Sequence, residues 1–129
     1  MNDRLNFKAE LSNEDSTVET ELALVSFQEE GVYFVYCPAL DLTGYGDNEE
    51  EAKSSFATTL KIYLDYTINN NTLLEDLEKH GWRIKSKNKL KSPDFAFLFK
   101  HNEQFKSIVN YRSFSKYNEI VKFPEYIYA

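Results

Sequence analysis

Three carboxylates near the middle of this 129-residue sequence are the first candidates for chemistry. Asp41, Asp47 and Glu50 offer the oxygen ligands that hard divalent cations prefer. The start of a helix explains two of them as well, because Asp47 is a good N-cap and Glu50 follows it by three residues, as in a capping box. We therefore interpret Gly46, Asp47 and Glu50 as a structural helix-start motif and expect no metal and no other cofactor.

The cysteine and the histidines also favour structural roles. Cys37, the single cysteine, lies between aromatic residues and Pro38 in a predicted strand, which is typical of a packed side chain. A single cysteine excludes an intrachain disulfide and fits a reducing compartment, so we expect a cytoplasmic protein. His80 precedes Gly81 where a helix should end, and a cation there complements the helix dipole. Apart from His101 there is no further histidine, and no phosphate loop, zinc spacing or nucleophile elbow, so we expect no catalytic residue and no enzyme.

A basic run offers a different chemistry. It consists of Arg83, Lys85, Lys87, Lys89 and Lys91, and five cations can bind the phosphates of a nucleic acid. No aromatic residue is interleaved with them to stack on bases, and lysines also protect exposed sheet edges. Nucleic-acid binding through this run therefore stands as one alternative beside a solvated loop.

Composition predicts one folded domain. The chain is 42% hydrophobic, with 10 Phe, 9 Tyr and one Trp, which is enough for one core and too little for two full domains. Its 28% of charged residues and its ordinary apolar share exclude global disorder and fibrous repeats. No apolar window approaches the length of a membrane span, and no basic segment followed by an apolar one opens the chain, so we expect no membrane association.

Charge is distributed unequally along the chain. Residues 1–80 carry 5 Lys or Arg against 17 Asp or Glu, a net −12, whereas residues 81–129 carry 10 against 4, a net +6. This asymmetry indicates an acidic face that binds one partner and a basic tail that binds another surface. That other surface could be the acidic half of a second copy of the chain.

A hairpin is the most clearly predicted local structure. Residues 21–28 alternate in the manner of a strand, Glu29-Glu30-Gly31 offers a turn in which glycine accepts a positive φ, and residues 32–37 are dense in β-branched and aromatic side chains. Pro38 should end this second strand, because it cannot donate a ladder hydrogen bond. A short third strand is expected over residues 40–45.

A long amphipathic helix should follow from Asp47. Its apolar residues recur every three or four positions, and this stripe is wide enough to cover a sheet. The helix should stop at Asn69-Asn70-Asn71, and Thr72 with Glu75 should begin a short second helix. The stripe consists of Ala52, Phe56, Leu60, Tyr63, Leu64 and Thr67.

Further elements are predicted from alternation, apolar runs or helical spacing. They are a strand over residues 5–11, a strand over 82–85 with Trp82 and Ile84 inward, a lysine-rich loop over 86–93, a buried strand over 95–99, a helix over 103–109, and a weakly alternating segment over 117–128 interrupted at Pro124.

Residues 36–64 carry a resemblance to a known family. The pattern is Tyr36-Cys37-Pro38-Ala39-Leu40, then Gly44, Gly46-Asp47, Glu50-Glu51-Ala52 and Ile62-Tyr63-Leu64. A strand ending at a proline, a glycine-bearing third strand, a Gly-Asp helix start with two glutamates and an alanine, and a helix running to a Tyr-Leu pair resemble the HicB antitoxin family over roughly residues 20–80. Asn48 departs from the threonine that is usual after Gly-Asp.

The resemblance implies an α+β fold of the partial ribonuclease-H-like type, βββαβ, in which an antiparallel sheet opened by a β-hairpin carries one long helix across a face. Within a single domain over 1–129, it implies a HicB-like core over about 17–86 and an aromatic-rich β/α C-terminal extension over about 87–129. It implies a non-catalytic antitoxin that binds and neutralises a small basic HicA-like ribonuclease toxin and forms a homodimer. Promoter binding is not carried over, because the segment after residue 85 lacks two adjacent amphipathic helices. An orphan homodimeric module with a structural or ligand-binding role and a nucleic-acid binder using residues 83–91 are the alternatives.

Overall fold

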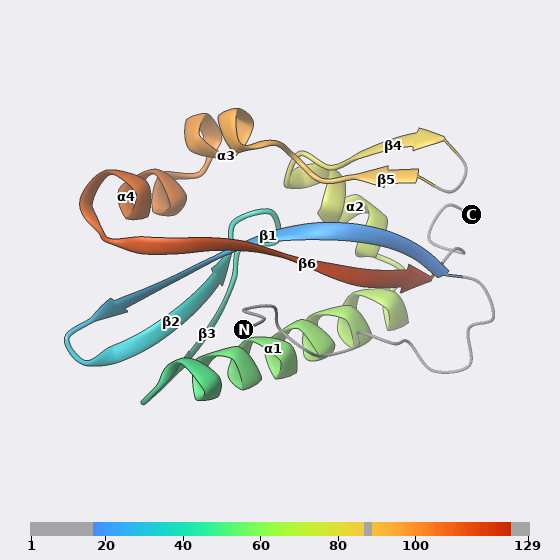
Figure 1. Cartoon of the computed structure of the whole chain (residues 1–129). Coiled ribbons are helices and arrows are strands. Elements are labelled where there is room, and N and C mark those ends of the chain that lie inside the picture. Colours follow the sequence, from blue (N-terminus) through green and yellow to red (C-terminus); the bar gives the residue numbers. More distant parts are fainter. Residues whose placement is uncertain (1–16, 87–88, 125–129) are drawn as a thin grey trace.

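A four-stranded antiparallel sheet forms the centre of the computed structural model, which describes residues 17–86 and 89–124 (Figure 1). The predicted strand over 5–11 lies outside these residues. The strand order is β3-β2-β1-β6, and the four strands are β1 (Thr17–Glu29), β2 (Val32–Cys37), β3 (Leu42–Gly46) and β6 (Phe114–Pro124). The predicted α+β class with an antiparallel sheet is therefore confirmed.

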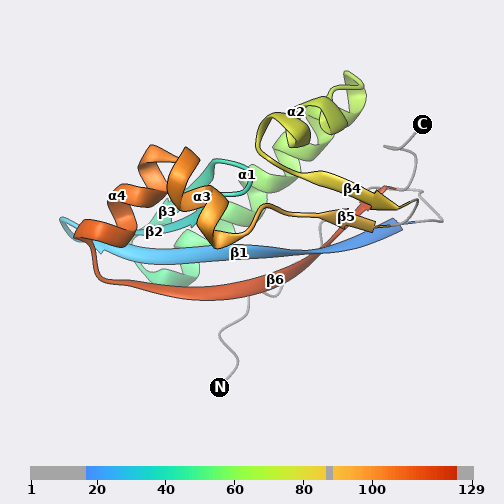
Figure 2. The same cartoon turned by 90° about the horizontal axis from the view of Figure 1, so that it is seen from above.

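Helices cover both faces of this sheet (Figures 1 and 2). Helix α1 (Glu49–Asn69) packs on one face, as predicted, and α3 (Phe95–His101) and α4 (Glu103–Tyr111) pack on the other. Among the described residues, no helix has both the length and the apolar character needed to cross a membrane. The remaining elements are α2 (Leu73–Lys79), β4 (Arg83–Ser86) and β5 (Lys89–Lys91).

The predicted hairpin is confirmed and sets the register of the sheet. Glu30 and Gly31 both have positive φ, 51° and 83°, which is the conformation of a two-residue turn whose twist matches that of the flanking strands. This turn places Phe27 opposite Phe34. Strand β1 begins at Thr17, earlier than alternation alone indicated, because β6 pairs with it from end to end.

Helix α1 lies unusually close to β3. A Cβ atom on Gly44 would lie 2.2 Å from the backbone nitrogen of Phe56, and one on Gly46 would lie 2.5 Å from the Cβ of Glu51. The two glycines thus let the helix backbone rest directly on the strand. The predicted apolar stripe of α1 is confirmed as buried, except for the half-buried Tyr63.

The helix start is built one residue later than the sequence predicted. Asn48, and not Asp47, is the N-cap of α1, and its side-chain oxygen accepts a hydrogen bond from the backbone N–H of Glu51 at 2.9 Å. The Glu51 carboxylate in turn accepts from the backbone N–H of Asp47 at 2.9 Å, so Glu50 takes no part. Since β3 runs to Gly46, Asp47 belongs to the bend that leaves the strand, and asparagine caps as well as aspartate does.

Helix α2 begins and ends where predicted, but the side chain of Thr72 makes no capping hydrogen bond to it. Thr72 precedes the helix, but its hydroxyl donates to the carbonyl oxygen of Thr67 at 3.4 Å, so it serves the end of α1 and not the start of α2. His80 is the C-cap, as predicted, and Gly81 follows with φ 93°. Asn71, with φ 57°, separates the two helices.

The prediction of a buried strand over 95–99 is wrong, because these residues form α3. Asp94 caps this helix, and its carboxylate accepts from the backbone N–H of Phe97 at 2.9 Å. A short unbroken apolar run has no periodicity that would distinguish a strand from a helix. Here the capping aspartate at its start favours the helix. The predicted helix over 103–109 is confirmed as α4.

The fourth strand of the main sheet is not the one that the βββαβ pattern implies. Strand β4 forms where predicted but pairs with β5, within the segment expected to be a loop, in a separate two-stranded hairpin. The place beside β1 is taken by β6, from the far end of the described chain. Strand β5 instead touches the early part of β1, where the Thr20 hydroxyl donates to the carbonyl oxygen of Leu90 at 3.3 Å.

Two hydrophobic cores stabilise the fold, one on each face of the sheet. The larger core lies under α1, and Trp82 joins it with its indole N–H donating to the carbonyl oxygen of Ala39 at 2.7 Å. The smaller core joins the sheet to α3 and α4 and contains Val25, Tyr36, Leu98, Phe105 and Ile108. Of the aromatic residues after residue 94, Phe105 and Phe123 are thus part of the structural core, whereas Phe95, Phe97 and Tyr111 are exposed.

Candidate protein-binding surface

The three carboxylates suggested as metal ligands are not brought together. Asp41 precedes β3, whereas Asp47 and Glu50 follow it, so the whole strand separates them. Over the ranges that the structure covers, no group of three or more His, Cys, Asp or Glu side chains is arranged to hold a metal ion. Asp41 instead accepts a hydrogen bond from the hydroxyl of Tyr36 at 2.7 Å.

Cys37 is fully buried in the larger core, as predicted. Burial raises the pKa of its thiol to about 12, so the nucleophilic thiolate is disfavoured at neutral pH. A thiol in this setting is a packing group.

The raised pKa of Cys37 predicts alkaline destabilisation. The unfolded chain releases the thiol proton above the ordinary value of 9.0, while the folded chain keeps it up to about 12, so stability is lost as pH rises through this window. One pH unit above the ordinary value, the loss should be about 1.4 kcal/mol. Urea unfolding at neutral pH and at about pH 10 measures it, and Cys37→Ala should remove about half of the total difference, because burial also raises the pKa of Tyr36, Tyr63 and Tyr117. An equal loss in Cys37→Ala would contradict the assignment.

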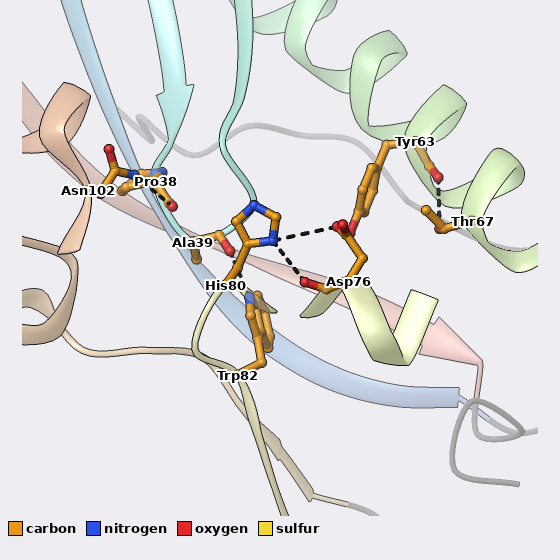
Figure 3. A network of polar contacts seen from close by, with 8 residues as sticks. All are labelled: Pro38, Ala39, Tyr63, Thr67, Asp76, His80, Trp82 and Asn102. Atoms are coloured by element: carbon orange, nitrogen blue, oxygen red, sulfur yellow. Dashed lines mark hydrogen bonds and ion pairs between the residues drawn. The ribbon is translucent and has the colours of Figure 1, made fainter. Parts of the chain in front are cut away.

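The two histidines line one hollow of about 350 Å³, together with Asp41, Asn102 and other residues. The His80 ring donates from Nδ1 to the carbonyl oxygen of Asp76 at 2.8 Å and lies 3.6 Å from the Asp76 carboxylate (Figure 3). The Tyr63 hydroxyl donates to the same carboxylate, and burial raises the pKa of Tyr63. This network joins α1 to α2 and therefore has a structural role.

Asn102 makes a second tie, between the α3–α4 pair and the loop after β2. Its side-chain N–H groups donate to the Tyr36 hydroxyl at 2.9 Å and to the carbonyl oxygen of Pro38 at 3.2 Å. Its side-chain oxygen accepts from the backbone N–H of Phe105 at 3.0 Å, which caps α4. One side chain thus fixes the helices over the smaller core.

Removal of this side chain should destabilise the protein measurably. Asn102→Ala deletes the N-cap of α4 and two hydrogen bonds, and leaves the buried hydroxyl of Tyr36 with one partner fewer. We expect a loss of about 2–3 kcal/mol in the free energy of unfolding, measured by urea denaturation. Asn110→Ala, at an exposed position of α4, is the control and should change stability by less than about 0.5 kcal/mol. Equal losses in the two variants would show that the tie is unimportant.

The predicted basic run is only partly placed. Arg83 and Lys91 are exposed and lie directly opposite each other in the β4–β5 hairpin. The side chains of Lys85 and Lys89 and the whole of Lys87 lie outside the description. Arg83 and Lys91 line a hollow of about 410 Å³ that Glu78 and Asp94 also line, so its charge is mixed.

Acidic residues are concentrated instead at the opposite end of the sheet, in the β1–β2 turn and at the start of α1, two segments that lie at the left of Figure 1. The β1–β2 turn and the start of α1 lie side by side there, because Tyr33 pairs with Gly46. Two cations are close by, and both are already in ion pairs: Arg112 with Glu29, and Lys53 with Glu49 at 3.9 Å. We call this surface the acidic end, and its carboxylates are Glu29, Glu30, Asp47, Glu49, Glu50 and Glu51.

The helix dipole explains only part of the acidic end. Glu49, Glu50 and Glu51 occupy the first turn of α1, where negative charge is favourable. Glu29, Glu30 and Asp47 lie outside that helix and have no such role. The negative charge at this end therefore exceeds what local structure requires.

An aromatic row crosses all four strands beside the acidic end. Phe27 pairs with Phe114 on β6 and with Phe34 on β2, and Phe34 pairs with Tyr45 on β3. The rings of Phe27 and Phe34 are stacked at 5.1 Å, and Tyr45 is 65% exposed. A hollow of about 550 Å³ is lined by Phe27, Phe34 and Phe114, and among its other lining residues are Glu49 and Arg112.

This aromatic row was not predicted from the sequence, although half of it follows from the hairpin register. The turn at Glu30-Gly31 fixes the hairpin register, and that register alone sets Phe27 opposite Phe34. The positions of Tyr45 and Phe114 depend on the pairing of β3 with β2 and of β6 with β1, which no local signal predicts.

Comparison of the chain with protein-family models, with curated proteins and with solved structures found no match. Inference about function therefore starts from the chemistry of the surface. Clustered carboxylates beside the exposed ring of Tyr45 and the half-buried rings of the aromatic row suit a basic protein surface, because the carboxylates pair with Lys and Arg while the rings supply contact area that excludes water.

Proposed function

We propose that this protein is a non-catalytic HicB-like antitoxin that binds and neutralises a small basic HicA-like ribonuclease. The observation that carries the proposal is the acidic end. It has six carboxylates and two nearby cations, and both cations are already in ion pairs. A ribonuclease must present cations to the phosphates of its substrate, and a surface rich in carboxylates competes for those same cations.

The proposed mechanism is occlusion. Charge complementarity accelerates the encounter between the acidic end and the basic toxin, and burial of the aromatic row then slows dissociation. RNA is excluded because the antitoxin covers the surface that would bind it. We further propose that the protein acts as a homodimer in the cytoplasm, where the thiol of Cys37 stays reduced.

Inhibition of a native partner tests the proposal. The tagged protein should recover a small basic protein from extracts of its host, and the purified partner should cleave RNA. Addition of this protein should stop the cleavage at a stoichiometric ratio. A pull-down that returns no basic protein, or RNA cleavage by this protein itself, would refute the proposal.

A further inference from the structure

The acidic end already binds one arginine of this chain, and its contacts show which groups of the surface bind a guanidinium. The guanidinium of Arg112 lies over the ring of Phe27, with its central carbon 6.0 Å from the ring centroid. The same guanidinium forms an ion pair with Glu29. An aromatic face and a carboxylate edge together satisfy the planar, delocalised cation of arginine.

The same two groups recur further along the aromatic row. Phe34 is stacked on Phe27, and Tyr45 lies next to Phe34 with their ring centroids 6.4 Å apart. Asp47 follows Tyr45 by two residues and is exposed. Within the described residues its carboxylate makes no hydrogen bond or ion pair, while its backbone N–H donates to Glu51.

We propose that the surface formed by Phe34, Tyr45 and Asp47 binds an arginine side chain of a partner protein, in the manner in which Phe27 and Glu29 hold Arg112. This inference deepens the proposed function by naming the side chain that the basic partner inserts, and it rests on that function only for the partner's identity. The partner's guanidinium stacks on Tyr45 and donates to the Asp47 carboxylate.

Charge and geometry select arginine among the possible occupants. A lysine ammonium is a strongly hydrated point charge and gains less from a flat ring than a guanidinium does. A single-stranded nucleic acid can stack its bases on aromatic side chains, but its phosphates would be repelled by the carboxylates of the acidic end. The occupant that satisfies both the rings and the charges is an arginine-bearing segment of protein.

Peptide binding tests this inference without the native partner. A fluorescein-labelled nona-arginine peptide and a nona-lysine peptide of the same charge are titrated with the full-length protein at low and physiological salt, and anisotropy is followed. We expect tighter binding of the arginine peptide, and a loss of about fivefold in its affinity in Tyr45→Ala. Tyr45→Phe should retain most of the affinity, while Asp47→Asn should weaken it.

Tyr66→Ala is the matched control, because Tyr66 is 67% exposed on α1 and lies outside the aromatic row. Equal losses in Tyr45→Ala and Tyr66→Ala would overturn the inference, and so would equal affinity for the two peptides. Tyr45-dependent binding of an oligothymidylate in place of the arginine peptide would overturn it in favour of base stacking.

The native partner separates this inference from the proposed function. If the arginine peptide binds through Tyr45 but no basic partner exists, the inference stands and the antitoxin proposal fails. If a basic toxin is inhibited equally by the wild-type protein and by Tyr45→Ala, the antitoxin proposal stands and the inference fails.

Discussion

Replacing Gly44 by alanine should destabilise the protein more than any other single change proposed for it. The added Cβ would lie 2.2 Å and 2.5 Å from the backbone nitrogen and Cα of Phe56, and 2.7 Å from the carbonyl oxygen of Ala52. These neighbours are backbone atoms and no rotamer change relieves the clash, so α1 would have to move off β3. We expect a loss of roughly 3 kcal/mol or more, at the upper end of overpacking effects and a large part of the stability of an ordinary domain.

Urea denaturation followed by circular dichroism measures this loss. Gly31→Ala is the matched control, because a Cβ on Gly31 meets nothing within 4 Å and strains only the positive φ of the turn. That strain should cost about 1 kcal/mol. If Gly44→Ala were the milder of the two changes, α1 could not lie as close to the sheet as the structure has it.

Charge reversal at the acidic end should abolish most of the affinity for the proposed basic partner. Glu30→Lys, Asp47→Lys and Glu50→Lys together change three exposed side chains that make no hydrogen bond or ion pair within the described residues. Like charges brought face to face at an interface cost several kcal/mol, so we expect a loss of about a hundredfold in affinity. The association rate should fall most at low salt, where screening is weakest.

A second triple variant controls for the change in net charge. Glu21→Lys, Glu75→Lys and Glu78→Lys alter the same number of exposed carboxylates, away from the acidic end. We expect this variant to bind the partner within a few-fold of the wild-type affinity, as measured by surface plasmon resonance. Similar losses in both variants would mean that net charge alone, and not the acidic end, attracts the partner.

The sequence predicts those parts of the fold that are determined by a few neighbouring residues. The Glu30-Gly31 turn, the apolar stripe of α1 and the His80-Gly81 helix end were all recognised, because turn conformation, helical periodicity and capping are local properties. The shift of the helix cap from Asp47 to Asn48 shows the limit of such signals, since two adjacent residues of equal capping ability cannot be ranked without knowing where β3 ends.

Long-range pairing was not accessible from the sequence. Residues 95–99 were assigned to a strand because five apolar residues in a row fit a buried strand and a helix equally well. Strand β6 pairs with β1 between residues that are 87 to 107 positions apart in the chain, and its weak alternation gives no reason to prefer that partner to β4. The aromatic row depends on this pairing, so half of the candidate surface remained out of reach.

The position of β6 at the margin of the main sheet bears on how copies of this protein meet. An unshielded strand of this length is an open template for aggregation, and proteins protect such strands with lysines, inward-pointing charges and proline. Strand β6 has all three, in the exposed Lys116 and Lys122, the buried Glu119 and the terminal Pro124. Copies of this protein should therefore not associate by joining two sheets along β6, so the proposed homodimer would form through a side-chain surface, and the strand should resist fibril growth at high concentration.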